Sequence, residues 1–307
     1  MYCIKLVVSL GLCYILIDNF MTKGVELLFF NIHWASILLS AFILCSLPIM
    51  IAGKVWIIIE RRIGVSSLLL SNLIAAFLNQ MLLPIVAGDA YRVRHLFLGG
   101  LSLREAFFAI FFERASSVFA LCALVFFCLN VFNFDQFYIV DFVSGLCFAV
   151  IMASLSLYYY YDIVLTSLTS FFKAANVTIE RMFGRKLNFE NFKPTSHGPK
   201  RFRDDILVVA ISIIGQLIPC FSAAVVAVHY PLEVSNFILF TIIPISLFLS
   251  LIPISIGGLG IREGAITFLL IQNGSEADVA LEFSFAFTIS IYLSTLPGLI
   301  FFILRKS

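Results

Sequence analysis

An apolar run of membrane length that breaks into glycines and an ion pair most constrains how this chain can fold. The run ends in the segment PISIGGLGIREGAITF, residues 253–268, in which Arg262 and Glu263 follow the break. Its helix-breaking residues are Pro253, Gly257, Gly258 and Gly260. Glycine adopts backbone conformations foreign to a helix, and inside hydrocarbon such a break is tolerated only where protein or water covers it. The segment predicts a broken membrane helix beside a polar cavity, although a surface glycine turn that caps a helix has the same pattern.

The same arrangement occurs earlier in the chain, at residues 65–84. This segment matches residues 234–253 at seven of twenty positions without a gap. Both copies continue from proline to glycine to arginine: the equivalent residues are Pro84 and Pro253, Gly88 and Gly257, and, after one inserted residue, Arg92 and Arg262. Internal repeats with interrupted segments at equivalent positions are typical of secondary transporters, in which they indicate the binding site.

The composition indicates an all-α polytopic membrane protein. Of the 307 residues, 61% are hydrophobic and only 12% are charged. Soluble domains carry about 25% charged residues. The seven cysteines lie in apolar segments without a CxxC pair, which is typical of buried, unreactive thiols. Because the sequence has no metal-ligand cluster, P-loop or dinucleotide fingerprint, we expect no cofactor and no metal, and we expect no nucleic-acid partner.

The distribution of Lys and Arg predicts the topology, because basic residues concentrate in cytoplasmic loops. We expect about six full spans, at residues 3–19, 35–59, 105–131, 137–161, 206–230 and 277–304. Two further segments, 66–87 and 236–256, are predicted to be re-entrant, one from each face of the membrane. On this path only Lys23 and Arg262 of the 20 basic residues lie outside, and both termini are cytoplasmic.

Residues 1–307 then form a single membrane domain. Its two halves, 35–131 and 206–304, are predicted to be inverted repeats, because their broken segments enter from opposite faces. A basic cytoplasmic loop at 162–205 joins them. In the first half, we expect Pro48 and Gly53 to interrupt the span at 35–59, which ends in the charged residues Lys54, Glu60, Arg61 and Arg62.

Asp89, Arg92 and Arg94 follow the first broken segment, where it returns to the inner surface. A guanidinium group suits a lipid phosphate because it donates two parallel hydrogen bonds to phosphate oxygens. Asp89 precedes Arg92 by three residues and could hold that side chain in place until an anion binds. The alternative is an arginine cluster that only anchors the chain at the cytoplasmic surface.

Glu113 and Arg114 lie deeper in the predicted membrane. If their helix begins near Arg104, Arg114 is about 15 Å along it, roughly half the thickness of the hydrocarbon core. Charge at that depth marks a transport pathway or an internal pair, so both residues are candidates for binding a substrate, with Glu113 as the candidate partner of Arg114. The alternatives are a purely structural pair or a helix that begins later. Arg262 and Glu263 are predicted to mirror the Arg92 region at the outer face.

Three motifs together, LPIVAGDAYR, FFERASS and PISIGGLGIREGAI, resemble the lysylphosphatidylglycerol synthase transmembrane-domain family from about residue 35 to the end of the chain. Family members often have two glycines before the aspartate, whereas here Ala87 precedes Gly88 and Asp89. The resemblance implies lipid translocation or lipid handling in a bacterial cytoplasmic membrane. Full-length synthases add a soluble domain that transfers an amino acid from tRNA to the lipid. This chain stops at Ser307, so we do not expect it to be an enzyme that makes aminoacyl lipid.

Three functions remain open at this point. The first is a flippase-like transporter of an anionic lipid, either a phospholipid or a polyprenyl-phosphate-linked lipid. The second is a membrane-bound lipid-linked transferase, which would need an acidic metal site or a histidine base that the sequence does not gather in one place. The third is a non-catalytic subunit that presents lipid to a soluble cytoplasmic enzyme docked on the loop at 162–205. The sequence does not separate the first from the third and does not predict the oligomeric state.

Overall fold

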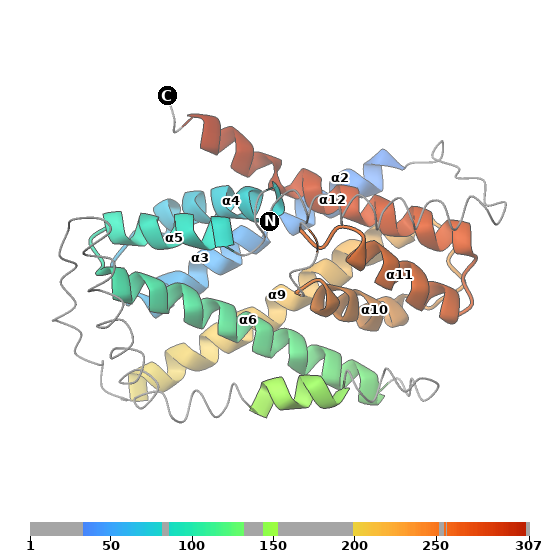
Figure 1. The fold of residues 1–307 in the computed structure, drawn as a ribbon, viewed down its shortest axis with the longest axis horizontal. Helices are drawn as coiled ribbons and strands as arrows, with labels where there is room; N and C mark the ends of the chain where they lie inside the picture. Colours follow the sequence, from blue (N-terminus) through green and yellow to red (C-terminus); the bar gives the residue numbers. More distant parts are fainter. Residues whose placement is uncertain are drawn as a thin grey trace.

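The computed structural model describes residues 33–81, 86–131, 144–152, 199–251, 255 and 257–304. These residues form helices and short turns, with no strand among them, so the all-α expectation is confirmed for the described chain. The helices are α2 (Trp34–Leu44), α3 (Leu47–Ile58), α4 (Val65–Met81), α5 (Val86–Leu98), α6 (Leu103–Val131), α9 (Pro199–Ala227), α10 (Asn236–Leu249), α11 (Ile261–Gln272) and α12 (Ala277–Leu304) (Figure 1). A further helical segment at 144–152 packs against α6.

Four stretches are long and apolar enough to cross a membrane: Trp34–Ile58, Leu103–Asn130, Arg203–Ala227 and Ala277–Leu304. They coincide with four of the predicted spans, those at 35–59, 105–131, 206–230 and 277–304. The predicted span at 3–19 and most of the one at 137–161 lie outside the described residues. The chain is therefore a helical membrane protein, and its total number of spans stays a prediction.

The first long stretch is two helices, and the interruption lies next to Pro48, as the sequence predicts. The chain bends at Cys45 and Ser46, and Pro48 lies in the first turn of α3. Proline is tolerated there because its missing N–H would have no helical partner. The prediction for Gly53 is wrong, since this residue lies inside α3 with open space around its Cα.

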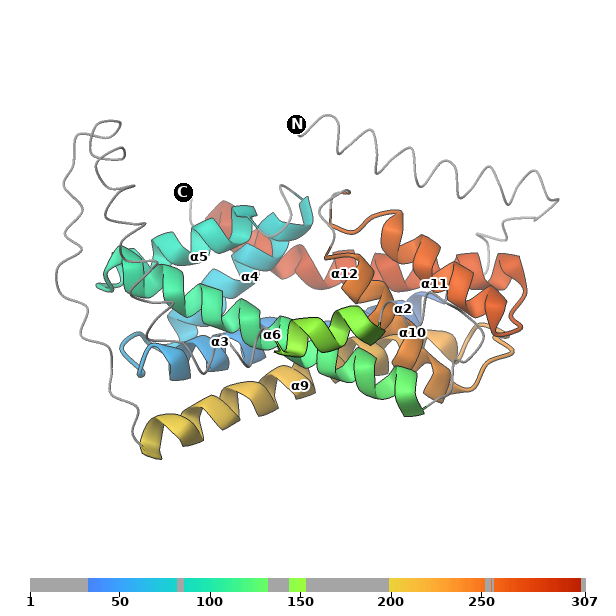
Figure 2. The same ribbon diagram turned by 60° about the horizontal axis from the view of Figure 1, so that its bottom comes forward.

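The two broken segments each form a helical hairpin, α4 with α5 and α10 with α11, and the two hairpins occupy opposite halves of the molecule (Figures 1 and 2). The first helices of these pairs have 17 and 14 residues, which corresponds to about 25 Å and 21 Å, short of a hydrocarbon core of about 30 Å. In the first hairpin, the Asn79 side-chain oxygen accepts a hydrogen bond of 2.9 Å from the Gly88 N–H. A Cβ on Gly88 would lie only 2.4 Å from the Ala75 carbonyl oxygen, so the helices approach closely where a side chain is absent.

The tips of the two hairpins meet. In the second hairpin, Gly257, Gly258 and Gly260 have φ values of 59°, 78° and 87°, a left-handed conformation that glycine adopts without strain. This turn brings Gly257 against the end of α4, where an added Cβ would lie 3.1 Å from both Nε2 and the carbonyl oxygen of Gln80. The two segments that repeat in sequence are therefore in contact in space.

Packing between the halves follows a matched pattern. The first hairpin packs through α4 against α12, the last helix of the second half, and the second hairpin packs through α10 against α6, the last helix of the first half. Similarly, α2 packs against α12, and α9 packs against α6, which it crosses in the view of Figure 1. The contact of α4 with α12 is tight, because a Cβ on Gly298 would lie 2.0 Å from the Leu73 carbonyl oxygen.

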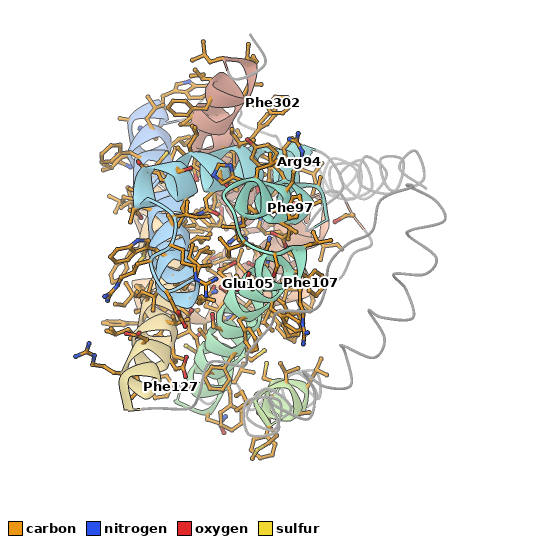
Figure 3. All side chains as sticks on the ribbon, turned by 90° about the vertical axis from the view of Figure 1, so that its left-hand side faces the viewer. Arg94, Phe97, Glu105, Phe107, Phe127 and Phe302 are labelled. Atoms are coloured by element: carbon orange, nitrogen blue, oxygen red, sulfur yellow. The ribbon has the colours of Figure 1, made fainter. Side chains whose placement is uncertain are left out.

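Buried hydroxyl groups and surface phenylalanines complete the membrane character of the fold. Ser40 of α2 bonds through Oγ to Ser222 Oγ of α9 at 2.6 Å and to Ser290 Oγ of α12 at 2.9 Å, and all three residues are fully buried. Such interhelical bonds are common between membrane helices, which lack a hydrophobic driving force for association in lipid. The outer surface is apolar instead, as shown by the exposed side chains of Phe107 and Phe127 (Figure 3).

Candidate functional site

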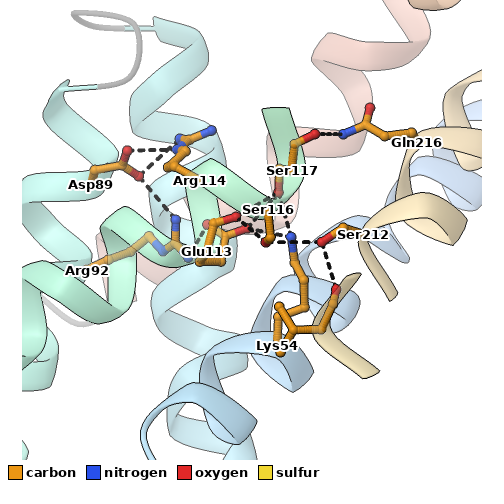
Figure 4. A network of polar contacts seen from close by, with 10 residues as sticks. Lys54, Asp89, Arg92, Glu113, Arg114, Ser116, Ser117, Ser212 and Gln216 are labelled. Atoms are coloured by element: carbon orange, nitrogen blue, oxygen red, sulfur yellow. Dashed lines mark hydrogen bonds and ion pairs between the residues drawn. The ribbon is translucent and has the colours of Figure 1, made fainter. Parts of the chain in front are cut away.

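Five charged side chains meet where α3, α5 and α6 pack together, and we call them the ion cluster (Figure 4). Its members are Lys54, Asp89, Arg92, Glu113 and Arg114. Because α6 begins at Leu103, Arg114 lies about 16 Å along the helix, deep in the apolar stretch. The helix thus starts where the sequence predicts, and the alternative of a later start is excluded.

The inner half of the ion cluster is built around Glu113, whose side chain is 2% exposed. Its Oε1 lies 2.7 Å from Lys54 Nζ, and its Oε2 lies 3.0 Å from Arg92 Nη2. Ser117, one turn along α6, donates to Glu113 Oε1 at 3.1 Å and accepts from Lys54 Nζ at 2.6 Å. A carboxylate in this position is stabilised by two cations and a hydroxyl group in a place that excludes water.

The outer half of the ion cluster is built around Asp89. Arg114 donates to both carboxylate oxygens of Asp89, through Nε at 2.8 Å and Nη2 at 3.0 Å, and Arg92 Nη1 lies 3.1 Å from Oδ1. The Arg114 side chain is 38% exposed and the Asp89 side chain 17%, against 4% for Arg92. The ion cluster therefore opens toward the surface at Arg114, which holds a carboxylate in the forked geometry that also suits a phosphate.

The structure brings Asp89 and Arg92 together as the sequence predicts. The predicted ion pair between Glu113 and Arg114 of α6 does not form. Glu113 is not the partner of Arg114, since successive residues of a helix point about 100° apart. Glu113 turns instead to Arg92 and Lys54, and Arg114 turns to Asp89. Helices α5 and α6 are thus joined by two ion pairs, in which each helix supplies one arginine and one carboxylate.

Lys54 is the member of the ion cluster that sequence reasoning missed. The sequence pattern places it among the charged residues that end the second span, yet its side chain is 4% exposed and lies inside α3. A signal was present, because five apolar residues separate Lys54 from Glu60, so the lysine is inside the apolar run and not after it.

The polar contacts continue from the ion cluster into α9 (Figure 4). Ser212 donates to Ser116 at 3.2 Å, and the Gln216 side-chain amide donates to the Ser117 carbonyl oxygen at 3.1 Å. Gln216 therefore pairs across helices. Arg94, another predicted site residue, is exposed on α5 and takes no part in the ion cluster (Figure 3).

A second polar group lies at the start of α11, and it is smaller. Arg262 and Glu263 are both buried, and Arg262 Nη2 lies 3.1 Å from Glu263 Oε1. Glu263 also accepts hydrogen bonds from the Gly260 backbone N–H and the Thr288 hydroxyl. The glutamate therefore caps the first turn of α11 as well as holding the arginine. Pro84 and Pro253, the predicted proline breaks, lie outside the described residues.

Away from the ion cluster, an exposed ion pair holds the loop between α3 and α4. Arg62 Nη1 lies 2.7 Å from Glu105 Oε1 in the first turn of α6. The hydrogen bond from the Arg62 guanidinium to this carboxylate raises the pKa of Arg62. Because the pair is exposed, it contributes little to the stability of the fold, and the buried ion pairs can be compared with it.

Comparison with known proteins agrees with the motifs. The family model described as the lysylphosphatidylglycerol synthase TM region matches residues 2–298, nearly the whole chain. No curated protein matches the sequence. Helices α2 to α11, the hairpin turn with its three glycines and the charged residues of α5 and α6 fall within the matched range, and α12 extends six residues beyond it. The chain belongs to the family of the lysylphosphatidylglycerol synthase TM region.

Proposed function

We propose that this protein is a flippase-like transporter that binds the anionic headgroup of a membrane lipid at the ion cluster and moves it across the bacterial cytoplasmic membrane. The observation that carries the proposal is the pair of guanidinium groups, Arg92 and Arg114, held by one carboxylate deep beside an apolar helix. Membership of a family named for the membrane region of a lipid-modifying synthase supports a role connected with lipid.

Binding would begin at Arg114, which is the accessible member of the ion cluster. A lipid phosphate offers the same paired oxygens as Asp89, so it can take over the forked hydrogen bonds of Arg114 and then reach Arg92. Asp89 holds both arginines in position while the phosphate is absent. A phosphate that crosses hydrocarbon unaided loses its hydration without compensation, and fixed donors along the route lower that cost.

Inverted repeats would supply the other half of the route. The matched packing of the two halves and the contact of Gly257 with Gln80 support this arrangement. In such a fold the two broken segments face opposite sides of the membrane, so Arg92 and Arg262 act as the two gates of one pathway. Alternate opening of the hairpins would then expose the headgroup to one leaflet at a time.

The test is translocation of a headgroup-labelled phosphatidylglycerol in proteoliposomes, read from the fraction of label that an impermeant quencher reaches. We expect wild type to exceed protein-free vesicles and Arg92→Ala to fall to the protein-free level. Arg94→Ala is the matched control, because Arg94 lies two residues away but outside the ion cluster, and it should retain wild-type activity. Binding of the labelled lipid by wild type without translocation would overturn the transporter and favour a subunit that presents lipid to a soluble partner.

A further inference from the structure

The ion cluster contains three cations and two carboxylates. Lys54, Arg92 and Arg114 pair only with Asp89 and Glu113, and these five residues form no ion pair with any other described residue. With every group ionised, the formal charge is three minus two, or +1. An uncompensated charge in an apolar environment is costly, so the ion cluster is one negative charge short.

The missing partner can be located within the ion cluster. Glu113 is already satisfied by Lys54 and Arg92, and Asp89 is shared between Arg92 and Arg114. Arg92 Nε is buried and has no hydrogen-bond partner in the part of the chain that the structure describes. A buried guanidinium donor without an acceptor is uncommon, because leaving it unpaired costs free energy. The excess charge and the unused donor both indicate an anionic ligand beside Arg92.

We infer that the ion cluster selects a headgroup with one negative charge, a phosphodiester, over a phosphomonoester, and that Lys54 sets this preference. The inference rests on the proposed function, in that it takes the ion cluster to be the headgroup site. A phosphodiester carries one charge and brings the sum to zero. A phosphomonoester has a second pKa of about 6 and carries nearly two charges at pH 8, which would leave the buried group near −1.

Lys54 acts here without touching the ligand. Lys54 contacts one carboxylate oxygen of Glu113, and Arg92 contacts the other. The positive charge of Lys54 therefore offsets the negative charge of Glu113, which would otherwise neutralise Arg92. Without Lys54 the remaining four charges sum to zero, and the ion cluster has no excess for an anion. Lys54 is thus a residue that determines specificity through charge, and Arg92 and Arg114 are the residues that make contact.

Two lipids that differ by one methyl group test the inference: phosphatidylmethanol, a diester, and phosphatidate, a monoester, with the same acyl chains. Binding to the full-length protein is measured at pH 8 in nanodiscs of phosphatidylcholine, by titration of each lipid against a labelled phosphatidylglycerol. We expect wild type to prefer phosphatidylmethanol by at least about tenfold. Because the two ligands are compared on one protein, a general loss of folded protein does not imitate this result.

Three variants change the charge in steps. Glu113→Gln raises it to +2 and should shift the preference toward phosphatidate, and Lys54→Gln lowers it to zero and should weaken both lipids. The double variant Lys54→Gln/Glu113→Gln returns it to +1 and should restore the preference for phosphatidylmethanol. The double variant separates charge from packing, because it carries both substitutions and still has the wild-type sum.

The outcomes distinguish this inference from the proposed function. If wild type binds neither anionic lipid above the phosphatidylcholine background, the headgroup site itself is wrong. If wild type binds both lipids equally or prefers phosphatidate, the headgroup site stands and the charge rule is wrong. Failure of the double variant to regain the preference, while it remains folded by size-exclusion chromatography and still binds either lipid, would show that Lys54 and Glu113 act through shape and not through charge.

Discussion

The two hairpins carry equivalent arginines in different electrostatic settings. Arg92 is held by two carboxylates from two helices and lies in a group with one excess positive charge. Arg262 is held by its neighbour Glu263, which is itself satisfied by Gly260 and Thr288, and this pair is neutral. Two segments related in sequence have thus produced one site with an excess positive charge and one site whose formal charge is zero, while the Nε of each arginine is buried without a partner among the described residues. The comparison predicts that the gate at Arg92 also binds the headgroup and that the gate at Arg262 does not.

The largest expected effect is loss of stability on removal of Glu113. The variant Glu113→Ala leaves Lys54 and Arg92 as unpaired like charges in an apolar place and should cost about 3–5 kcal/mol. The measurement is thermal unfolding of the purified protein in detergent. Arg62→Ala is the control, because it removes only surface ion pairs, including the one with Glu105, and it should cost no more than about 1 kcal/mol. Equal losses of stability in the two variants would show that the buried ion pairs of Glu113 contribute no more than a surface ion pair.

The next effect separates binding from transport. We expect Arg92→Ala to lose both binding and translocation of a labelled anionic phospholipid, by at least about tenfold. Arg262→Ala should lose translocation but keep binding, since its site is already neutral. Lysine at either position should give partial activity, because it keeps the charge and loses the fork. Loss of binding in Arg262→Ala, with the protein still folded, would make the two sites equivalent and remove the distinction between them.

Glycine substitutions give a smaller effect that compares the two hairpin turns. Gly88→Ala drives a Cβ to 2.4 Å from the Ala75 carbonyl oxygen and should cost about 1–3 kcal/mol through separation of α4 from α5. Gly257→Ala has more room but places alanine at a φ of 59°, which should cost about 1–2 kcal/mol. Thermal unfolding reports both variants. Gly53→Ala is the matched control, because it lies in a helix with open space, and it should stabilise the protein by up to about 1 kcal/mol.

The smallest perturbation tests which side of the membrane a loop of each half faces. In a background without the seven native cysteines, Arg94→Cys and Glu233→Cys change exposed side chains, so each should alter stability by no more than about 0.5 kcal/mol. We expect an impermeant thiol reagent to label position 94 from the cytoplasmic side and position 233 from the outside. Labelling of both positions from one side would contradict the inverted topology, whatever the transport assays show.

Local features explain which parts of the fold could be predicted from the sequence. The start of α6 near Arg104 follows from the change from polar loop to apolar run, and the structure begins the helix at Leu103. The start of α11 follows from the glycine turn, which ends at Gly260. The interruption of the first long stretch follows from Pro48, because the chain leaves the helix at Cys45 and Ser46 just before it. The predicted interruption at Gly53 failed, because glycine permits a break in a helix but does not require one.

The sequence by itself determined the membrane class, four of the long apolar helices, the two broken segments and the family. These properties depend on composition, on the length of apolar runs and on the backbone freedom of glycine, all of which are local. Only the tertiary structure decided that Lys54 joins Glu113, that Arg114 joins Asp89 and that Gly257 touches Gln80. The physical reason is that an ion pair depends on which helix faces meet. Lys54 and Glu113 are 59 positions apart in the chain, and nothing in the residues between them specifies the contact.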